Sequence, residues 1–180
     1  MIWNGAFVEM NKSPLRIVCD AGPIIHLDEL DCLHLLNDFQ EILIGPTIQS
    51  EIQKNRQNIV MGVDLKFREI PLSVPADPTL SAMCRAFSLD AGEIESLAIM
   101  EKEPEAIFLT DDAAARLVGE RMGFQVHGTI GILLRSIRRK QMIPEEVLGI
   151  LESMPLKGTL FIKPSLLEEI KINVRNEFNL

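Results

Sequence analysis

Aromatic and cysteine residues are scarce in this sequence. The 180 residues include no tyrosine and one tryptophan, Trp3, and only 5% are aromatic. An extended aromatic platform for stacking single-stranded nucleic acid is therefore not expected. The three cysteines, Cys19, Cys32 and Cys84, form no C-x-x-C pair. An odd number of cysteines without a pattern is typical of reduced thiols, so we expect a cytoplasmic protein without a disulfide framework.

Long hydrophobic runs and an excess of positive charge are also absent. No stretch approaches the roughly 20 apolar residues that span a membrane, so we expect no membrane association. The segment 1–12 contains Glu9 and lacks the basic start of a signal peptide. Asp and Glu, 26 in all, outnumber the 18 Lys and Arg, which gives a net charge of −8. Bulk charge therefore argues against generic nucleic-acid binding, which would have to depend on local basic patches and metal ions.

Several common catalytic motifs are missing. The sequence has no G-x-x-x-x-G-K-[ST], no G-x-G-x-x-G and no G-x-S-x-G. A phosphatase with an Asp nucleophile would need a second acid two residues after the first, where Gly22 stands. His26, His34 and His127 have no zinc-ligand spacing. The first two lie in apolar helical runs and are typical of residues at the edge of a core, whereas His127 ends a strand and is a weak candidate for substrate contact.

The remaining pattern predicts an α/β fold with a mainly parallel sheet, because short apolar runs alternate with helical segments. Hydrophobic residues make up 47% of the chain, and this length can bury a sizeable core. Thr47 and Thr129 are plausible N-caps, the second for a helix over 130–141, and Gly123 is a plausible helix stop. We expect strands near residues 15–20, 41–44, 65–72, 106–110, 124–127 and 159–162.

We expect one main domain with two appendages. Residues 1–14 form an N-terminal arm, and residues 15–180 form the domain. Within that domain the core extends to about residue 142, and residues 143–180 form a C-terminal helical extension that includes a helix opened by Pro164.

Two of the expected strands run directly into aspartate. Asp20 follows an apolar run near the start of the chain, and Asp111 and Asp112 follow Ile107-Phe108-Leu109-Thr110. Parallel strands present their carboxyl ends at one edge of the sheet, which is where sites form in open α/β folds. Glu51 and Glu93 fall on helices that follow other strands. We therefore expect Asp20, Glu51, Glu93, Asp111 and Asp112 to meet at that edge.

Each of these acids also has a purely structural interpretation. Asp20 and Asp111 could be helix N-caps, and Asp90-x-x-Glu93 fits an Asp-led capping box. Glu51 could be a solvated helix residue. Together, however, the acids would repel one another: two carboxylates about 5 Å apart repel by roughly 3 kcal/mol at an effective dielectric constant of 20. A cation would relieve this repulsion, and oxygen-only ligands suit Mg²⁺ or Mn²⁺. Such ions support phosphodiester hydrolysis.

In order along the chain, four local sequences resemble the PIN domain, in particular prokaryotic PIN-like proteins related to VapC-type toxins. The resemblance covers about residues 15–140, and no single motif carries it. It is carried by Asp20-Ala21-Gly22-Pro23-Ile24-Ile25, Gly92-Glu93-x-x-Ser96-Leu97-Ala98, Thr110-Asp111-Asp112-x-x-x-Arg116 and Gly128-Thr129-Ile130-Gly131-Ile132-Leu133-Leu134.

This resemblance implies a three-layer α/β/α fold and metal-dependent endoribonuclease activity on RNA. It also implies a homodimer and, for a toxin, an antitoxin protein as partner. Two positions depart from the family pattern: Gly22 replaces the usual Ser or Thr, and Glu93 stands where many toxins carry Asp. The implied catalytic residues are Asp20, Glu51, Glu93 and Asp111, and the implied ligands of Mg²⁺ or Mn²⁺ are Asp20, Glu93, Asp111 and Asp112.

Basic residues provide candidate contacts to RNA. Arg135, Arg138, Arg139 and Lys140 cluster at the end of an expected helix, where they could equally complement the helix dipole. Arg116 could pair with an acid or touch phosphate. An alternative function stays open at this point: a non-cleaving PIN-like module that binds nucleic acid or protein, in which Gly22 marks the loss of catalysis.

Overall fold

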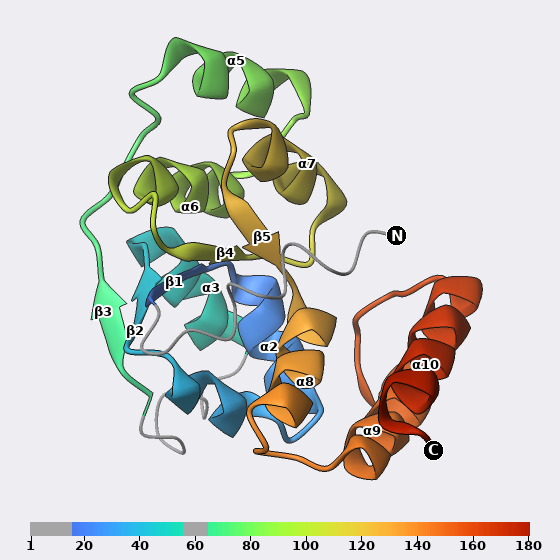
Figure 1. The fold of residues 1–180 in the computed structure, drawn as a ribbon. Helices are drawn as coiled ribbons and strands as arrows, with labels where there is room; N and C mark the ends of the chain where they lie inside the picture. Colours follow the sequence, from blue (N-terminus) through green and yellow to red (C-terminus); the bar gives the residue numbers. More distant parts are fainter. Residues whose placement is uncertain (1–15, 56–64) are drawn as a thin grey trace.

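Five short parallel strands form the central sheet of the computed structural model, in the order β3-β2-β1-β4-β5 (Figure 1). The structure describes residues 16–55 and 65–180, so the arm expected at residues 1–14 lies outside the described residues. The predicted α/β architecture is confirmed. The strands are β1 (Arg16–Cys19), β2 (Glu41–Ile44), β3 (Phe67–Glu69), β4 (Ile107–Leu109) and β5 (Gln125–His127).

Helices connect the strands and cover both faces of the sheet, giving three layers (Figure 1). A 3₁₀ helix, η1, spans Leu33–Asp38 in place of one of the expected short helices. The α-helices are α2 (Ala21–Glu29), α3 (Pro46–Asn55), α5 (Pro78–Ala86), α6 (Ala91–Lys102), α7 (Ala113–Arg121), α8 (Thr129–Arg138), α9 (Pro144–Lys157) and α10 (Pro164–Phe178).

Side-chain alternation along the strands builds a separate core on each face. In β1, Ile17 and Cys19 pack into one hydrophobic cluster with α2, α3 and α8. The residue between them, Val18, packs into a second cluster with α5, α6 and α7. Because all three side chains are fully buried, the strand is an uninterrupted apolar run, as expected for the inside of a parallel sheet.

Two predicted helix caps and one predicted strand are wrong. Helix α3 already begins at Pro46, so Thr47 lies inside it, and its backbone N–H donates to the buried Glu95 Oε2 at 3.0 Å. Helix α8 begins at Thr129 itself, with Gly128 as its N-cap. Residues 159–162 form no strand. Their apolar alternation has another cause: Leu160 and Ile162 pack against the core from an irregular segment.

The C-terminal helices α9 and α10 pack side by side, and α9 also contacts α8 (Figure 1). This confirms that the last part of the chain is helical. Within residues 16–55 and 65–180, no helix combines the length and the apolar character needed to cross a membrane.

Candidate active site

Asp20 and Thr110 meet where β1 and β4 end. The two strands are in register, with Cys19 beside Leu109, and the Asp20 backbone N–H donates to the Leu109 carbonyl at 2.9 Å. Thr110 Oγ1 donates to Asp20 Oδ2 at 3.0 Å and accepts from the Asp112 backbone N–H at 3.1 Å. One buried hydroxyl therefore links the carboxyl ends of both strands and fixes the Asp20 carboxylate.

Asp20 is both a helix cap and a buried acid. Its Oδ1 accepts from the Ala21 backbone N–H at 2.8 Å at the start of α2, which confirms the capping interpretation. The residue is only 8% exposed. Burial, together with the charges of Asp90 and Glu51, raises the pKa of Asp20 to about 6 despite the lowering effect of the hydrogen bonds from Ala21 and Thr110. A carboxylate held at this position is destabilised by its surroundings.

Glu93 and Asp90 form the predicted capping box at the start of α6. Glu93 N–H donates to Asp90 Oδ1 at 2.9 Å, and Asp90 N–H donates to Glu93 Oε2 at 2.8 Å. Burial raises the pKa of Glu93 to about 7, helped by the charges of Asp90, Asp112 and Asp20. The capping box engages only Oε2 of the Glu93 carboxylate. Glu93 therefore still interacts electrostatically with Asp20 and Asp112.

Glu51 reaches this cluster from α3. Burial raises its pKa, and the charge of Asp90 adds to the effect. Gly92 permits the approach of α3 to α6, because a Cβ at that position would lie 2.7 Å from Ile48 Cδ1. The same Cβ would lie 3.6 Å from Glu51 Oε2, which places the Glu51 carboxylate over the first turn of α6.

Asp111 is held by three contacts from other elements. Thr129 donates to it twice, from its backbone N–H to Oδ1 at 2.8 Å and from its hydroxyl to Oδ2 at 2.6 Å. His26 Nδ1 lies 2.8 Å from the same Oδ2. Gly128 allows Asp111 to sit here, since a Cβ on that glycine would lie 2.4 Å from Asp111 Oδ1. Thr129 thus orients an acid instead of capping α8.

The N-cap of α7 is Asp112, not Asp111. Asp112 Oδ1 accepts from the backbone N–H groups of Ala114 at 2.7 Å and Ala115 at 2.8 Å. The sequence placed the cap one residue too early. Asp111 is consequently available for tertiary contacts, while Asp112 remains at the rim of the same cavity.

Four of the predicted acids, Asp20, Glu51, Asp111 and Asp112, line one cavity of about 350 Å³ at the carboxyl edge of the sheet. Glu93 is not part of that lining and approaches it only through its capping partner Asp90. The sequence predicted four of its acids but assigned Asp90 only a capping role, and it treated His26 as a core-edge residue. His26 follows Gly22 by one helical turn, and that spacing is the only signal that could have placed it here. The polar lining residues are Asp20, His26, Glu51, Asp90, Asp111, Asp112 and Thr159.

Carboxylate oxygens are donors that fit a hard divalent cation, and the pKa values of Asp20, Glu51 and Glu93 are raised by burial and by neighbouring acids. The structure also limits this fit. Within the described ranges, no group of three or more His, Cys, Asp or Glu side chains is already arranged to hold one metal ion. The donor types are suitable, and the carboxylates would have to converge further to bind an ion.

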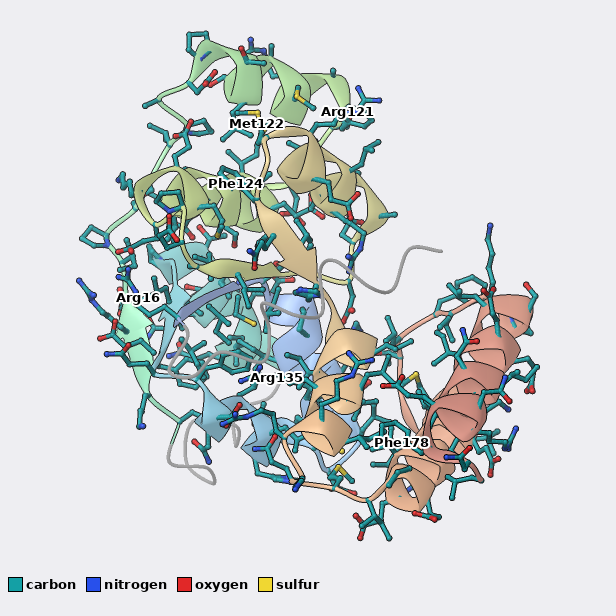
Figure 2. The ribbon with its side chains drawn as sticks, viewed as in Figure 1. Arg16, Arg121, Met122, Phe124, Arg135 and Phe178 are labelled. Atoms are coloured by element: carbon teal, nitrogen blue, oxygen red, sulfur yellow. The ribbon has the colours of Figure 1, made fainter. Side chains whose placement is uncertain are left out.

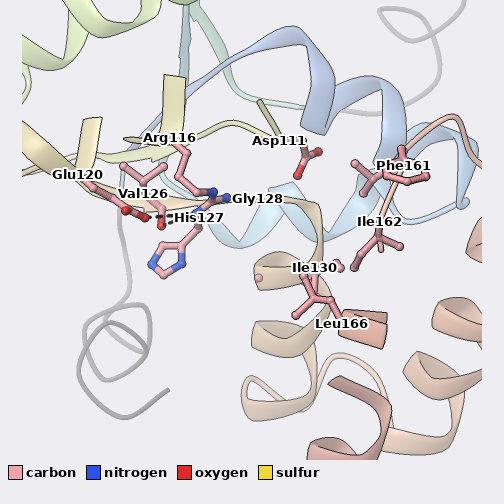
Figure 3. Close-up of a pocket in the computed structure, with 12 residues that line it drawn as sticks. Asp111, Arg116, Glu120, Val126, His127, Gly128, Ile130, Phe161, Ile162 and Leu166 are labelled. Atoms are coloured by element: carbon pink, nitrogen blue, oxygen red, sulfur yellow. Dashed lines mark hydrogen bonds and ion pairs between the residues drawn. The ribbon is translucent and has the colours of Figure 1, made fainter. Parts of the chain in front are cut away.

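Arg116 lies beside the acidic cavity and makes local bonds. Its Nη2 donates to the Thr110 carbonyl at 3.0 Å and its Nη1 to the Val126 carbonyl at 3.3 Å, with Glu120 Oε1 3.8 Å away. It lines a neighbouring cavity of about 360 Å³ together with Asp111 and His127 (Figure 3). Burial, with the nearby charges of Arg116 and Arg135, lowers the pKa of His127 to about 4, so this imidazole is neutral at pH 7.

The basic cluster at the end of α8 is largely committed to contacts within the chain. Arg135 is only 2% exposed, pairs with Asp38 and stacks over the Phe39 ring at 4.9 Å from its centroid. Figure 2 shows Arg135 within the body of the molecule, unlike Arg121 at its periphery. A guanidinium buried this deeply cannot reach a phosphate, so Arg135 is not an RNA contact. Nearby, Arg139 also pairs with Asp38, Arg138 pairs with Glu177, and the exposed Lys140 follows α8.

The metal-free protein is expected to lose stability as the pH rises from 5 to 8. Asp20 is protonated below pH 6 in the fold but only below its ordinary pKa of 3.8 when unfolded. Between these values the native state binds more protons, so unfolding becomes easier as pH increases. The whole shift of about two units corresponds to roughly 3 kcal/mol, and the part that falls between pH 5 and pH 8, about one unit, corresponds to roughly 1.4 kcal/mol. Urea unfolding with EDTA at pH 5 and pH 8 measures this loss of stability.

Asp20→Asn should reduce the loss of stability, whereas Glu105→Gln, at the opposite end of β4, should not. Equal pH dependence in all three proteins would contradict the assignment.

Comparison with known proteins adds one finding. A family model described as a PIN domain matches residues 16–176, which include every acid of the cavity. No curated protein and no solved structure matches the chain.

Proposed function

The chain belongs to the PIN-domain family, and from that membership and the acidic cavity we propose that it is a metal-dependent endoribonuclease that hydrolyses RNA phosphodiester bonds. The family and the parallel α/β/α architecture give it a nuclease-like fold. The choice of RNA as the substrate and of Mg²⁺ or Mn²⁺ as the cofactor is our proposal.

The observation that carries this proposal is the electrostatics of the cavity. Asp20 and Glu93 have pKa values raised to about 6 and about 7, partly by the charges of neighbouring acids. Surface acids that serve only as caps do not need to be buried near one another. A cluster in which one carboxylate is buried and its neighbours are partly buried is typical of functional sites.

We propose that Asp20, Glu93 and Asp111 hold the metal, with Asp112 as a further ligand. When bound, Mg²⁺ or Mn²⁺ supplies an activated water and stabilises negative charge on the phosphodiester. The chain's own contribution is orientation. Thr110 holds the Asp20 carboxylate, and Thr129 with His26 holds Asp111. Glu51, whose pKa is also raised, is proposed as a supporting catalytic acid.

The family serine or threonine at position 22 is replaced by glycine, and the structure shows what lies around it. A Cβ at Gly22 would lie 3.6 Å from His26 Cε1 and 3.9 Å from Asp111 Cβ, both ordinary contacts. The site therefore has room for the missing side chain. The Thr110 hydroxyl already donates a hydrogen bond to the Asp20 carboxylate. This bond supports an ordered acidic site even though Gly22 has no hydroxyl.

Contacts to RNA phosphates are proposed for Arg116, Arg138, Arg139 and Lys140. Arg138 and Arg139 would have to exchange their partners Glu177 and Asp38 for phosphate. We further propose a homodimer and, if the protein is a toxin, an antitoxin partner in a cytoplasmic toxin–antitoxin pair. Exposed apolar side chains at the C-terminal helices, such as Leu156 and Ile172, are consistent with such a protein contact.

The test is cleavage of a panel of structured and unstructured RNAs by the full chain. We expect internal cleavage with Mg²⁺ or Mn²⁺ and none with EDTA, and Glu105→Gln should behave as the wild type. DNA of the same sequences tests the preference for RNA. If neither the wild type nor Gly22→Ser cleaves any RNA with metal present, the non-cleaving binding module is the better interpretation.

A further inference from the structure

The segment 158–163, here called the strap, joins α9 to α10 and exposes an aromatic ring. Leu160 and Ile162 pack against the hydrophobic core, and Phe161 between them is 84% exposed. Because successive side chains of an extended segment point in opposite directions, burial of the two neighbours directs Phe161 outward. The exposure of this ring follows from the way in which the strap is anchored.

A second contact fixes the strap beside the acidic cavity. Glu29 Oε2, at the end of α2, accepts from the Thr159 backbone N–H at 2.7 Å and from the Thr159 hydroxyl at 2.9 Å. Asp20 is the N-cap of α2 and Glu29 is its last residue, so the two ends of one helix carry a proposed metal ligand and the anchor of the strap. The position of Phe161 is thereby tied to the position of the acids.

Phe161 borders two adjoining cavities. Together with Leu160 and Asp111 it lines both the acidic cavity and the neighbouring one of about 360 Å³. Figure 3 shows Asp111 between Phe161 on one side and Arg116 with His127 on the other. The neighbouring cavity is mostly apolar, with Val126, Ile130, Ile162 and Leu166 in its wall.

This arrangement matches the chemistry of a nucleotide, which has a flat aromatic base next to an anionic phosphate. The phosphate would be held through the proposed divalent cation, because the carboxylates alone would repel it. A phosphate in the acidic cavity would place its neighbouring base beside Phe161 and the apolar wall. His127 in that wall is neutral at pH 7, because its pKa is lowered to about 4. An aromatic ring stacks on any base through its face and contributes binding without sequence readout. A base inside a duplex is already stacked and hydrogen-bonded, so it cannot occupy this place.

We propose that Phe161 stacks on the nucleobase adjacent to the phosphate in the acidic cavity and so positions the substrate. This inference rests on the proposed function, because it takes the acidic cavity as the phosphate site. The scarcity of aromatic residues excluded an extended platform, and a single ring at the site is consistent with that exclusion.

The experiment measures RNA binding separately from cleavage. All proteins carry Glu51→Gln, which removes a proposed catalytic acid and keeps the proposed metal ligands, so that the RNA stays intact, and binding to a fluorescent single-stranded RNA is followed by anisotropy in Mg²⁺. We expect Phe161→Ala to weaken binding by between about fivefold and a hundredfold. Phe161→Trp should retain affinity, and Phe161→Leu should lose about as much as Phe161→Ala, because an aliphatic side chain has no aromatic face.

Two controls make the result specific. Leu72→Ala removes another apolar side chain, 71% exposed before α5 and absent from both cavities, and should leave binding unchanged. Since Trp3 is the only tryptophan in the sequence, Trp3→Phe combined with Phe161→Trp gives a single reporter at the site. Its emission should be quenched by single-stranded RNA and not by a duplex of the same sequence.

Three results would overturn the inference. The first is full binding by Phe161→Leu, and the second is an unchanged tryptophan emission at saturating single-stranded RNA. The third is unaltered RNA binding by Phe161→Ala together with loss of self-association in light scattering, which would make the ring a contact to a second copy of the chain. Absence of cleavage by the wild type would instead count against the proposed function alone, because binding is measured in a variant that is not expected to cleave.

Discussion

Asp20→Asn is expected to reduce metal-dependent RNA cleavage by at least about a hundredfold without unfolding the protein. A bound divalent ion contributes several kcal/mol of transition-state stabilisation, and each 1.36 kcal/mol is a factor of about ten in rate. Asn keeps the cap of α2, because its side-chain oxygen can still accept from the Ala21 N–H. It removes the buried charge whose pKa is raised to about 6.

Stability measurements separate loss of a ligand from loss of the fold. In EDTA at pH 8, Asp20→Asn should melt at or above the temperature of the wild type, because a charge disfavoured by burial is gone. Added Mn²⁺ should raise the melting temperature of the wild type, by mass action on the native state, and raise that of the variant much less. A variant with wild-type cleavage and the same response to Mn²⁺ would show that Asp20 is only a helix cap.

Asp111→Asn should also abolish cleavage, but its stability is less informative. Asp111 accepts from Thr129 at both oxygens and contacts His26. An amide in its place presents a donor to one of these groups, so the metal-free variant should be less stable for reasons unrelated to the metal. Asp20→Asn is therefore the cleaner substitution, and Glu105→Gln, remote from the cavity, is the matched control for both.

Asp38→Ala is expected to lower the free energy of unfolding by about 3–5 kcal/mol, because it leaves buried Arg135 without its carboxylate. The same substitution also removes the partner of Arg139. Adding Arg135→Met should recover part of the loss, since the uncompensated buried charge is then gone. Urea unfolding of the single and double variants measures both changes.

The ion pair between Arg138 and Glu177 provides the comparison. Arg138 lies on α8, as Arg135 does, but its pair with Glu177 is more exposed. Glu177→Ala should cost no more than about 1 kcal/mol. If Asp38→Ala lowers the free energy of unfolding as little as Glu177→Ala does, then the end of α8 is not stabilised by a buried charge pair. Arg139, which shares Asp38 with Arg135, would in that case be available for RNA.

The order of strands and helices could be predicted from the sequence, because hydrophobic periodicity is a local property. The same holds for the acids at the ends of β1 and β4, since parallel strands of one sheet present their carboxyl ends together. The capping box of Asp90 and Glu93 needs only two residues three positions apart and was predicted correctly. In each case the information lies within a few consecutive residues.

Other features depend on contacts between distant segments, and local sequence patterns indicated them wrongly or not at all. Asp111 was assigned a possible cap, but its partners Thr129 and His26 are 18 and 85 residues away. Arg135 belongs to a basic run that predicted contacts to RNA, yet it is buried, and its partner Asp38 is 97 residues away in the sequence. The apolar alternation at Leu160 and Ile162 predicted a strand, whereas it anchors a strap that exposes Phe161. Periodicity specifies which residues are buried, but only packing specifies the surface against which they are buried.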